Sequence, residues 1–419
     1  MRRITEFLLC LYVFSIPWDF IPIPGIGSLA RLQGIVVVAA VVLTVLSEGR
    51  IRKPDPVLGF ATLFAVLSIL SLTWTVAPGF TYTAAVAYAQ LILSVWIVRE
   101  IARTREQQQR VIFAFCLGIF VPIVSLMINF IRGTQLEMSG QEQFSSVGLN
   151  ADSVGVLLTI GFPFAWYLMT TQGRVRRVLS MLYLGLAPIG VMLTAVRGAF
   201  LALLVALMIV PLSMKLSTRS LVRAIVLLFA LGTAVLWAVP ASSWRRIATI
   251  PEEIGSGSMS ARRDLWTAGI RAFPERPLLG FGAGAFGTAI EPLHMTRFKN
   301  DLPAHSVPVG LLVEHGVIGF VAFVALLVAC GFTIIRLPPQ ERMLWSVLML
   351  VWIVGAISGS LERWKVTWVL FGLLAAQSGP RSQRHAVRQL KPTPGRPTHQ
   401  VPAYATSGPV RVNQRIDHR

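Results

Sequence analysis

The chain has 419 residues, of which 54% are hydrophobic and 14% are charged, and its mean hydropathy is +0.66. Soluble domains carry about 25% charged residues, so this composition excludes a soluble globular protein and indicates an integral membrane protein. Much of the net charge of +19 lies in basic loops. Such loops suit contact with anionic lipid headgroups. We therefore expect the lipid bilayer, and no nucleic acid, as a partner.

Apolar segments long enough to cross a bilayer recur along the chain. No small-residue cleavage site follows the first of them, so we expect it to stay in the mature protein. The expected fold class is an all-α polytopic membrane protein with a transmembrane domain over residues 1–378. About twelve transmembrane helices are predicted, at roughly residues 4–22, 31–48, 56–74, 82–98, 110–131, 151–170, 178–195, 198–214, 221–240, 316–335, 343–360 and 366–378.

Basic residues predict the orientation of these spans, because short cytoplasmic loops carry an excess of lysine and arginine. With a cytoplasmic N-terminus, twelve spans return the C-terminus to the cytoplasm. Residues 379–419, rich in proline and arginine, are then expected to form a disordered basic cytoplasmic tail. Every cytoplasmic loop is basic in this arrangement, through Arg50, Arg52, Lys53, Arg99, Arg103, Arg105, Arg110, Arg174, Arg176, Arg177, Lys215, Arg219, Arg223, Arg336 and Arg342.

A long outward-facing loop separates spans nine and ten, over residues 241–303. It carries eight arginines and lysines against the positive-inside preference, and long ordered loops are commonly functional. Within it, the spacing of Leu265, Trp266, Ile270 and Phe273 predicts an amphipathic helix near the outer membrane surface. We therefore expect the chemistry to lie in this loop.

The sequence PLLGFGAGAFG follows that helix as a glycine-rich turn. Its residues 282–287, GAGAFG, formally match the dinucleotide-binding pattern G-x-G-x-x-G. That pattern requires a preceding strand and a following helix within a βαβ unit, and nothing in the sequence supplies one. These glycines more simply let the backbone bend tightly or approach another group closely.

Several motifs, in a fixed order, resemble those of the O-antigen ligase and polymerase superfamily. They are SLTWTVAPGFTYT at 71–83, SVGLNADSVGVLLTIGFPFAW at 146–166, LTAVRGA at 193–199, ARRDLW at 261–266, ERPLLGFGAGAF at 275–286 and AHSVPVGLLVEHGVIGF at 304–320. The likeness runs from the first span to about residue 377. It implies a GT-C-like membrane fold in the bacterial inner membrane, without a cofactor.

Members of this family transfer a glycan from a polyprenyl-diphosphate carrier, such as undecaprenyl diphosphate, to an acceptor sugar hydroxyl. By resemblance, Arg197 and Arg262 match family arginines that would bind the diphosphate, and His305 matches the family's catalytic histidine. Two departures are Val196, where serine is frequent, and Ser306, where asparagine is usual. Arg263 and Trp266, beside Arg262 in ARRDLW, are expected to support the site.

The chemistry of these side chains fits a glycan transfer in which a diphosphate is the leaving group. Arginine binds phosphate oxygens bidentately and can stabilise the charge that develops on a diphosphate leaving group. Neutral imidazole can accept the proton of the attacking hydroxyl, and the predicted helix start after Ser306 would favour bound phosphate. The alternatives are a lipid-headgroup contact or structural ion pair for Arg197, and a capping or core role for His305.

Glu314 and His315 are ionisable residues in an apolar stretch. Glu314 lies nine residues past His305, about 180° around an ideal helix. We expect it to support the site as the partner of an arginine such as Arg197 or Arg262, unless it is a snorkelling surface carboxylate. His315, next to a predicted break at Gly316, is expected to be structural. The spacing of these residues matches no recognised zinc site, and we expect no metal.

The sequence predicts a metal-independent, inverting glycosyl transfer, since it offers no Asp-x-Asp pair and no obvious protein nucleophile. A ligase would transfer the glycan to lipid A-core, making lipopolysaccharide. A polymerase of the same fold would add it to another lipid-linked repeat of an O-antigen, capsule or exopolysaccharide. A polyprenyl-oligosaccharide transporter is disfavoured, because polar residues gather at the outer face and the two halves show no repeat.

Overall fold

The computed structural model describes residues 1–19, 22–23, 27–134, 143–171, 173–213, 218–251, 260–291 and 302–378. Three 3₁₀ turns, Ile16–Trp18, Ser71–Thr73 and Phe273–Glu275, and a hairpin of two-residue strands, β1 (Pro22–Ile23) and β2 (Gly27–Ser28), join helices. The helices are α1 (Arg2–Ser15), α2 (Leu29–Glu48), α3 (Pro56–Leu70), α4 (Pro78–Ile101), α5 (Arg105–Ile131), α6 (Ala151–Thr171), α7 (Arg174–Thr194), α8 (Arg197–Leu207), α9 (Ile209–Ser213), α10 (Thr218–Ala238), α11 (Ala241–Ala248), α13 (Ser260–Ala272), α14 (Phe286–Ile290), α15 (Val307–Ile335), α16 (Pro339–Ser358) and α17 (Lys365–Gln377).

The prediction of an all-α polytopic membrane protein is confirmed. Eight helices in the described part of the chain are long and apolar enough to cross a membrane: α2, α3 with the turn after it, α4, α5, α6, α7, α15 and α16. Each of the twelve predicted spans overlaps a helix, but α1, α8 with α9, and α17 are shorter than these eight, and in α10 only Phe229–Ala238 counts as an apolar helix. The number of crossings therefore stays a prediction. The tail at 379–419 lies outside the described residues.

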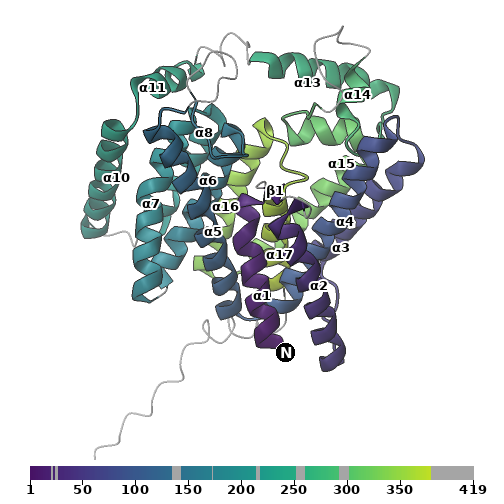
Figure 1. Ribbon diagram of the computed structural model, residues 1–419, viewed down its shortest axis with the longest axis horizontal. Coiled ribbons are helices and arrows are strands. Elements are labelled where there is room, and N and C mark those ends of the chain that lie inside the picture. Colours follow the sequence, from purple (N-terminus) through teal and green to yellow (C-terminus); the bar gives the residue numbers. More distant parts are fainter. Residues whose placement is uncertain are drawn as a thin grey trace, which may run out of the picture.

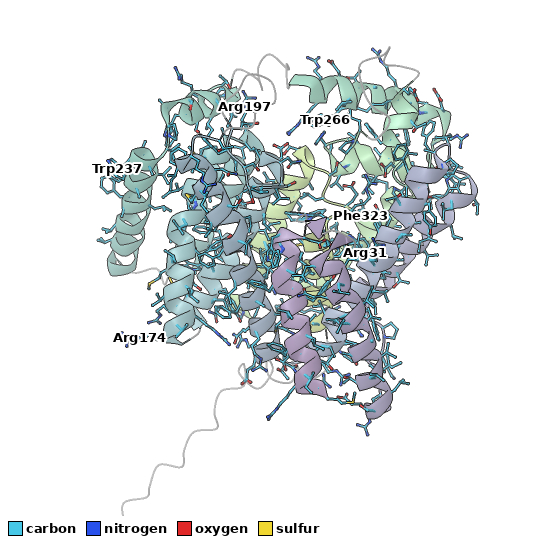
Figure 2. The ribbon with its side chains drawn as sticks, in the orientation of Figure 1. Arg31, Arg174, Arg197, Trp237, Trp266 and Phe323 are labelled. Atoms are coloured by element: carbon cyan, nitrogen blue, oxygen red, sulfur yellow. The ribbon has the colours of Figure 1, made fainter. Side chains whose placement is uncertain are left out.

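Several of the loops predicted to be cytoplasmic lie at one end of the bundle, where Figure 1 marks the N-terminus. Ion pairs link them there: Glu48 accepts from Arg2 at 2.9 Å and from Arg103 at 3.2 Å, and Glu6 pairs with Arg110. Figure 2 shows Arg174 towards this end, and Arg197 and Trp266 at the opposite end. We call these the basic end and the site end.

The bundle has an apolar surface as well as an apolar core. Aromatic rings fill its centre, where Phe323 packs edge-on against Phe64 with ring centroids 5.0 Å apart. Large apolar side chains also point outward, and Trp237 on the peripheral helix α10 is 91% exposed (Figure 2). Such a surface suits contact with lipid chains rather than water.

Helix α15 is broken at Gly316, whose φ of 62° and ψ of −167° are not helical. The segment 277–284, which we call the glycine strap, fills the break. Phe281 and Gly282 donate backbone hydrogen bonds to the carbonyls of Val313 and Glu314, both at 2.9 Å. In return, Val317 donates to Pro277 at 2.8 Å. The strap thereby satisfies backbone groups that the break would leave unpaired inside a membrane protein.

The strap confirms the expected glycine-rich turn. Gly280, Gly282 and Gly284 all have positive φ, between 68° and 108°. A Cβ on Gly280 would lie 2.5 Å from the carbonyl carbon of Glu314, so close backbone approach also requires glycine there. The strap leads into the five-residue helix α14 with no strand before it among residues 260–281. The dinucleotide-binding pattern is therefore accidental here, as expected.

The helix predicted in the long loop is α13, at the site end (Figure 1). Its apolar face is only partly as predicted. Leu265, Ala268 and Ala272 are buried against α14 and α15, whereas Ile270 is 62% exposed. The exposed side chain of Ile270 leaves the expected contact of this helix with the membrane surface a prediction.

Candidate functional site

Arg197 is the first residue of α8 and follows a tight turn in which Ala195 has a left-handed φ of 50°. Its Nε donates to the backbone oxygen of Arg246 at 3.1 Å, and its Nη2 donates to Oγ1 of Thr249 at 2.6 Å. These contacts draw the end of α11 against the start of α8. The predicted position of Arg197, in a tight turn between two helices, is confirmed.

Arg262 lies in the first turn of α13 and pairs with Asp152, its Nη2 standing 2.5 Å from the carboxylate Oδ2. Asp152 is in the first turn of α6. Asn150 caps that helix, since its Oδ1 accepts from the backbone of Ser153 at 2.7 Å. The helix dipole favours a carboxylate at this position. Sequence reasoning missed Asp152, which lies 110 residues from its partner.

His305 directly precedes α15, which begins at Val307 with Ser306 as its N-cap residue. The backbone of His305 is left-handed, with φ of 49°. Two contacts hold this strained conformation: its N–H donates to Oγ of Ser360 at 3.1 Å, and Nε1 of Trp266 donates to the oxygen of Ala304 at 3.0 Å. Strained backbone that neighbours over-determine is typical of functional sites.

The charge state of His305 follows from its surroundings. Burial lowers the pKa of its imidazole, the nearby charge of Arg262 lowers it further, and the carboxylate of Asp152 opposes them. All three side chains are therefore within electrostatic reach of one another. Neutral imidazole dominates at pH 7, which is the form that can accept a proton.

The turn between α16 and α17, residues 358–364, connects the parts of the site. Ser358 lies against Gly198, where an added Cβ would come within 2.4 Å of its Oγ, and Ser360 holds the backbone of His305. Arg363 lies against Gly284 of the glycine strap. The 358–364 turn thus touches the segments that carry Arg197 and His305. Its sequence, SGSLERW, matches no motif that would have revealed this.

Glu314 is buried, and its Oε2 accepts from the backbone N–H of Gly284 at 2.8 Å. Its charge is the largest influence that raises the pKa of Arg363. We expected Glu314 to partner an arginine such as Arg197 or Arg262, and the arginine on which its charge acts is instead Arg363, from the 358–364 turn. The strap, seated in the helix break, brings Gly284 to this carboxylate, while Asp152 pairs with Arg262.

The other predicted residues occupy distinct positions. Trp266 donates to the oxygen of Ala304, beside His305, and its supporting role stays a prediction. Arg263 is exposed on α13, and its supporting role stays a prediction. His315 is buried, with Nε2 2.9 Å from Oγ of Ser68 and its ring 5.0 Å from that of Phe64, as expected of a structural histidine. Arg297 and Lys299 of the long loop lie outside the described residues.

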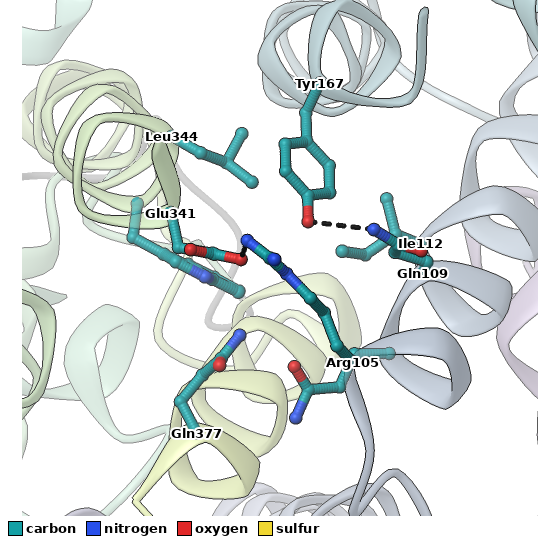
Figure 3. A pocket seen from close by; sticks show the side chains of 9 residues that line it. Arg105, Gln109, Ile112, Tyr167, Glu341, Leu344 and Gln377 are labelled. Carbon is teal, nitrogen blue, oxygen red and sulfur yellow. Dashed lines mark hydrogen bonds and ion pairs between the residues drawn. The ribbon is translucent and has the colours of Figure 1, made fainter. Parts of the chain in front are cut away.

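A separate, small polar recess lies at the basic end, and Figure 3 shows the side chains that line it. Arg105 pairs with Glu341 across it, and Gln109 donates to the hydroxyl of Tyr167 at 3.0 Å. The recess lies at the opposite end from Arg197 and Trp266. It therefore takes no part in the candidate site.

Comparison with protein families decides the relationship. Residues 179–324 match the family model described as O-antigen ligase. This match over about a third of the chain supports membership of the O-antigen ligase family. The matched stretch runs from α7 into α15 and contains Arg197, Arg262, His305 and Glu314, whereas Asp152 and the 358–364 turn lie outside it. A search of curated proteins finds no match to this chain.

Proposed function

We propose that this protein is a glycosyltransferase that moves a glycan from polyprenyl diphosphate to a sugar hydroxyl of lipid A-core. One observation carries the proposal. Arg197, Arg262 and His305 come from three segments spread over more than 100 residues, yet the 358–364 turn contacts the segments of Arg197 and His305, and the charge of Arg262 acts on His305. The match to the O-antigen ligase family model supports an enzyme of the ligase or polymerase type.

The arginines suit the leaving group. As the glycosidic C–O bond breaks, its electron pair passes to the diphosphate, and negative charge grows on the terminal phosphate. Guanidinium groups fixed beforehand stabilise that charge without reorganising. Arg197, held by Thr249 and the backbone of Arg246, is fixed in this sense.

His305 suits the attacking group. Its neutral imidazole would accept the acceptor hydroxyl's proton while that oxygen bonds to the anomeric carbon. Direct attack of this kind inverts the anomeric centre, and none of its steps needs a metal ion. The reaction would take place on the outer face of the bacterial inner membrane, with both termini of the chain in the cytoplasm.

The experiment is transfer by purified protein in proteoliposomes, with polyprenyl-diphosphate glycan as donor, in the presence of EDTA. Lipid A-core and a second lipid-linked repeat are offered as separate acceptors. We expect transfer to lipid A-core, with inversion visible in the anomeric NMR couplings of the product. Chain extension on the lipid carrier would instead establish a polymerase, and loss of activity in EDTA or retention of configuration would overturn the mechanism.

A further inference from the structure

The pair formed by Asp152 and Arg262 is partly open to solvent. The side chain of Arg262 is 29% exposed and that of Asp152 is 34% exposed. Partly exposed ion pairs contribute little to stability. Buried apolar side chains and the Trp266 hydrogen bond already attach α13 to α14, α15 and the segment before His305. The attachment of α13 to α14 and α15 therefore does not depend on Arg262, whose ion pair with Asp152 is reached by solvent.

Arg262 lies one helical turn before Trp266, so both side chains project from the same face of α13. Trp266 contacts Ala304, the residue before His305. The pair of Arg262 and Asp152 is thus beside the imidazole, and its charges act on that imidazole in opposite directions. Any ligand that binds Arg262 in place of Asp152 leaves the Asp152 carboxylate without its cation, beside the imidazole of His305.

We propose that Asp152 is a resident counter-ion that the donor's diphosphate displaces from Arg262, after which its carboxylate stabilises the imidazolium form of His305. This inference rests on the function proposed above. A diphosphate offers more charge and more acceptor oxygens than one carboxylate, so it competes well for the guanidinium. The displaced carboxylate stays in the first turn of α6, where the helix dipole favours an anion.

The exchange of partners at Arg262 accompanies the charges that form during glycan transfer. The acceptor hydroxyl gives its proton to His305 as its oxygen bonds to the anomeric carbon, and the diphosphate leaves with the electron pair of the broken bond. Arg262 is then paired with the phosphate oxygens and Asp152 with the imidazolium. Asp152 gains no proton, so it acts as a positioning residue and not as the base.

The test is Asp152→Asn, which keeps the shape of the side chain and removes its charge. Inorganic pyrophosphate, titrated into the purified full-length protein by calorimetry, serves as the probe of the diphosphate site. We expect its Kd to fall about threefold to fivefold, as for loss of one partly exposed competing ion pair. In the transfer assay we expect kcat to fall at least about tenfold, because the imidazolium loses its counter-ion.

Two further variants separate exchange from a structural role. In an Arg262→Gln background, Asp152→Asn should leave the Kd for pyrophosphate unchanged, since the competition needs the guanidinium. Glu48→Gln, which removes the partner of Arg2 and Arg103 at the basic end, is the matched control and should change neither quantity. Weaker pyrophosphate binding or an unchanged kcat in Asp152→Asn would overturn the proposal, as would tighter binding that persists without Arg262.

If Asp152→Asn does not fold, Asp152→Glu provides the test. A carboxylate on a longer side chain can still be displaced and can still face His305, so kcat should stay within about threefold of wild type. If Asp152 instead served only to fix Arg262 in place, the longer side chain would disrupt that ion pair. A loss of kcat larger than threefold would therefore contradict the exchange. If wild-type protein transfers no glycan but Asp152→Asn tightens pyrophosphate binding, the proposed function fails while the exchange at Arg262 stands.

Discussion

His305 shows how individual residues make the candidate site. A histidine in the left-handed region is uncommon, and here the side chains of Ser360 and Trp266 both hold the peptide bond between Ala304 and His305. The sequence indicated His305, Arg197 and Arg262 because each lies within a short motif that resembles one of the family. Asp152, Ser360 and Arg363 were missed because their roles arise only when distant segments meet, and no local pattern records such a meeting.

The pH dependence of transfer tests the state of His305. Burial and Arg262 lower the pKa of its imidazole, and only the neutral form can accept the proton. Activity should therefore be lost as pH falls through a value below the ordinary 6.5 of histidine, and should be constant from there to pH 8. The measurement is kcat/KM between pH 5 and 8. The residual rate of His305→Ala should lack this acidic limb, and a wild-type limb above pH 6.5 would contradict the assignment.

At the scale of elements, the broken helix α15 and the glycine strap form one unit. Composition indicated both parts, through Gly316 and the glycines at 280, 282 and 284. It did not indicate that the strap enters the break, because the hydrogen bonds that join them connect residues more than 30 positions apart. This unit also explains why Glu314 meets Gly284 and Arg363 and not the arginines of the site.

Gly316→Ala tests that unit. The new methyl group would lie 2.3 Å from the oxygen of Leu278, at a φ of 62° that side chains rarely adopt. We expect a loss of about 2 kcal/mol or more in stability, together with reduced transfer. The measurement is thermal unfolding in detergent. Gly331→Ala is the control, because it lies in the same helix with nothing within 4 Å of the added carbon; equal stability of the two variants would contradict the role of the break.

The whole molecule divides its charges between two ends. Basic loops and their ion pairs with Glu6 and Glu48 occupy one end, and the arginines of the candidate site occupy the other. The sequence predicted this division because charge and hydropathy vary along the chain in a simple alternation. It could not predict how the helices pack, because apolar residues that face lipid and apolar residues that face the core have the same composition. Trp237, for example, is 91% exposed, whereas Trp352 is buried.

The central claim is that the site end performs glycosyl transfer through His305 and the arginines. The most direct measurement is the rate of glycan transfer in proteoliposomes by wild type, His305→Ala, Arg197→Gln and Arg174→Gln, the last of which alters the basic end. We predict that wild type and Arg174→Gln transfer at similar rates, and that the other two lose about 100-fold or more. Full activity in His305→Ala and Arg197→Gln, in protein that folds normally, would contradict the claim.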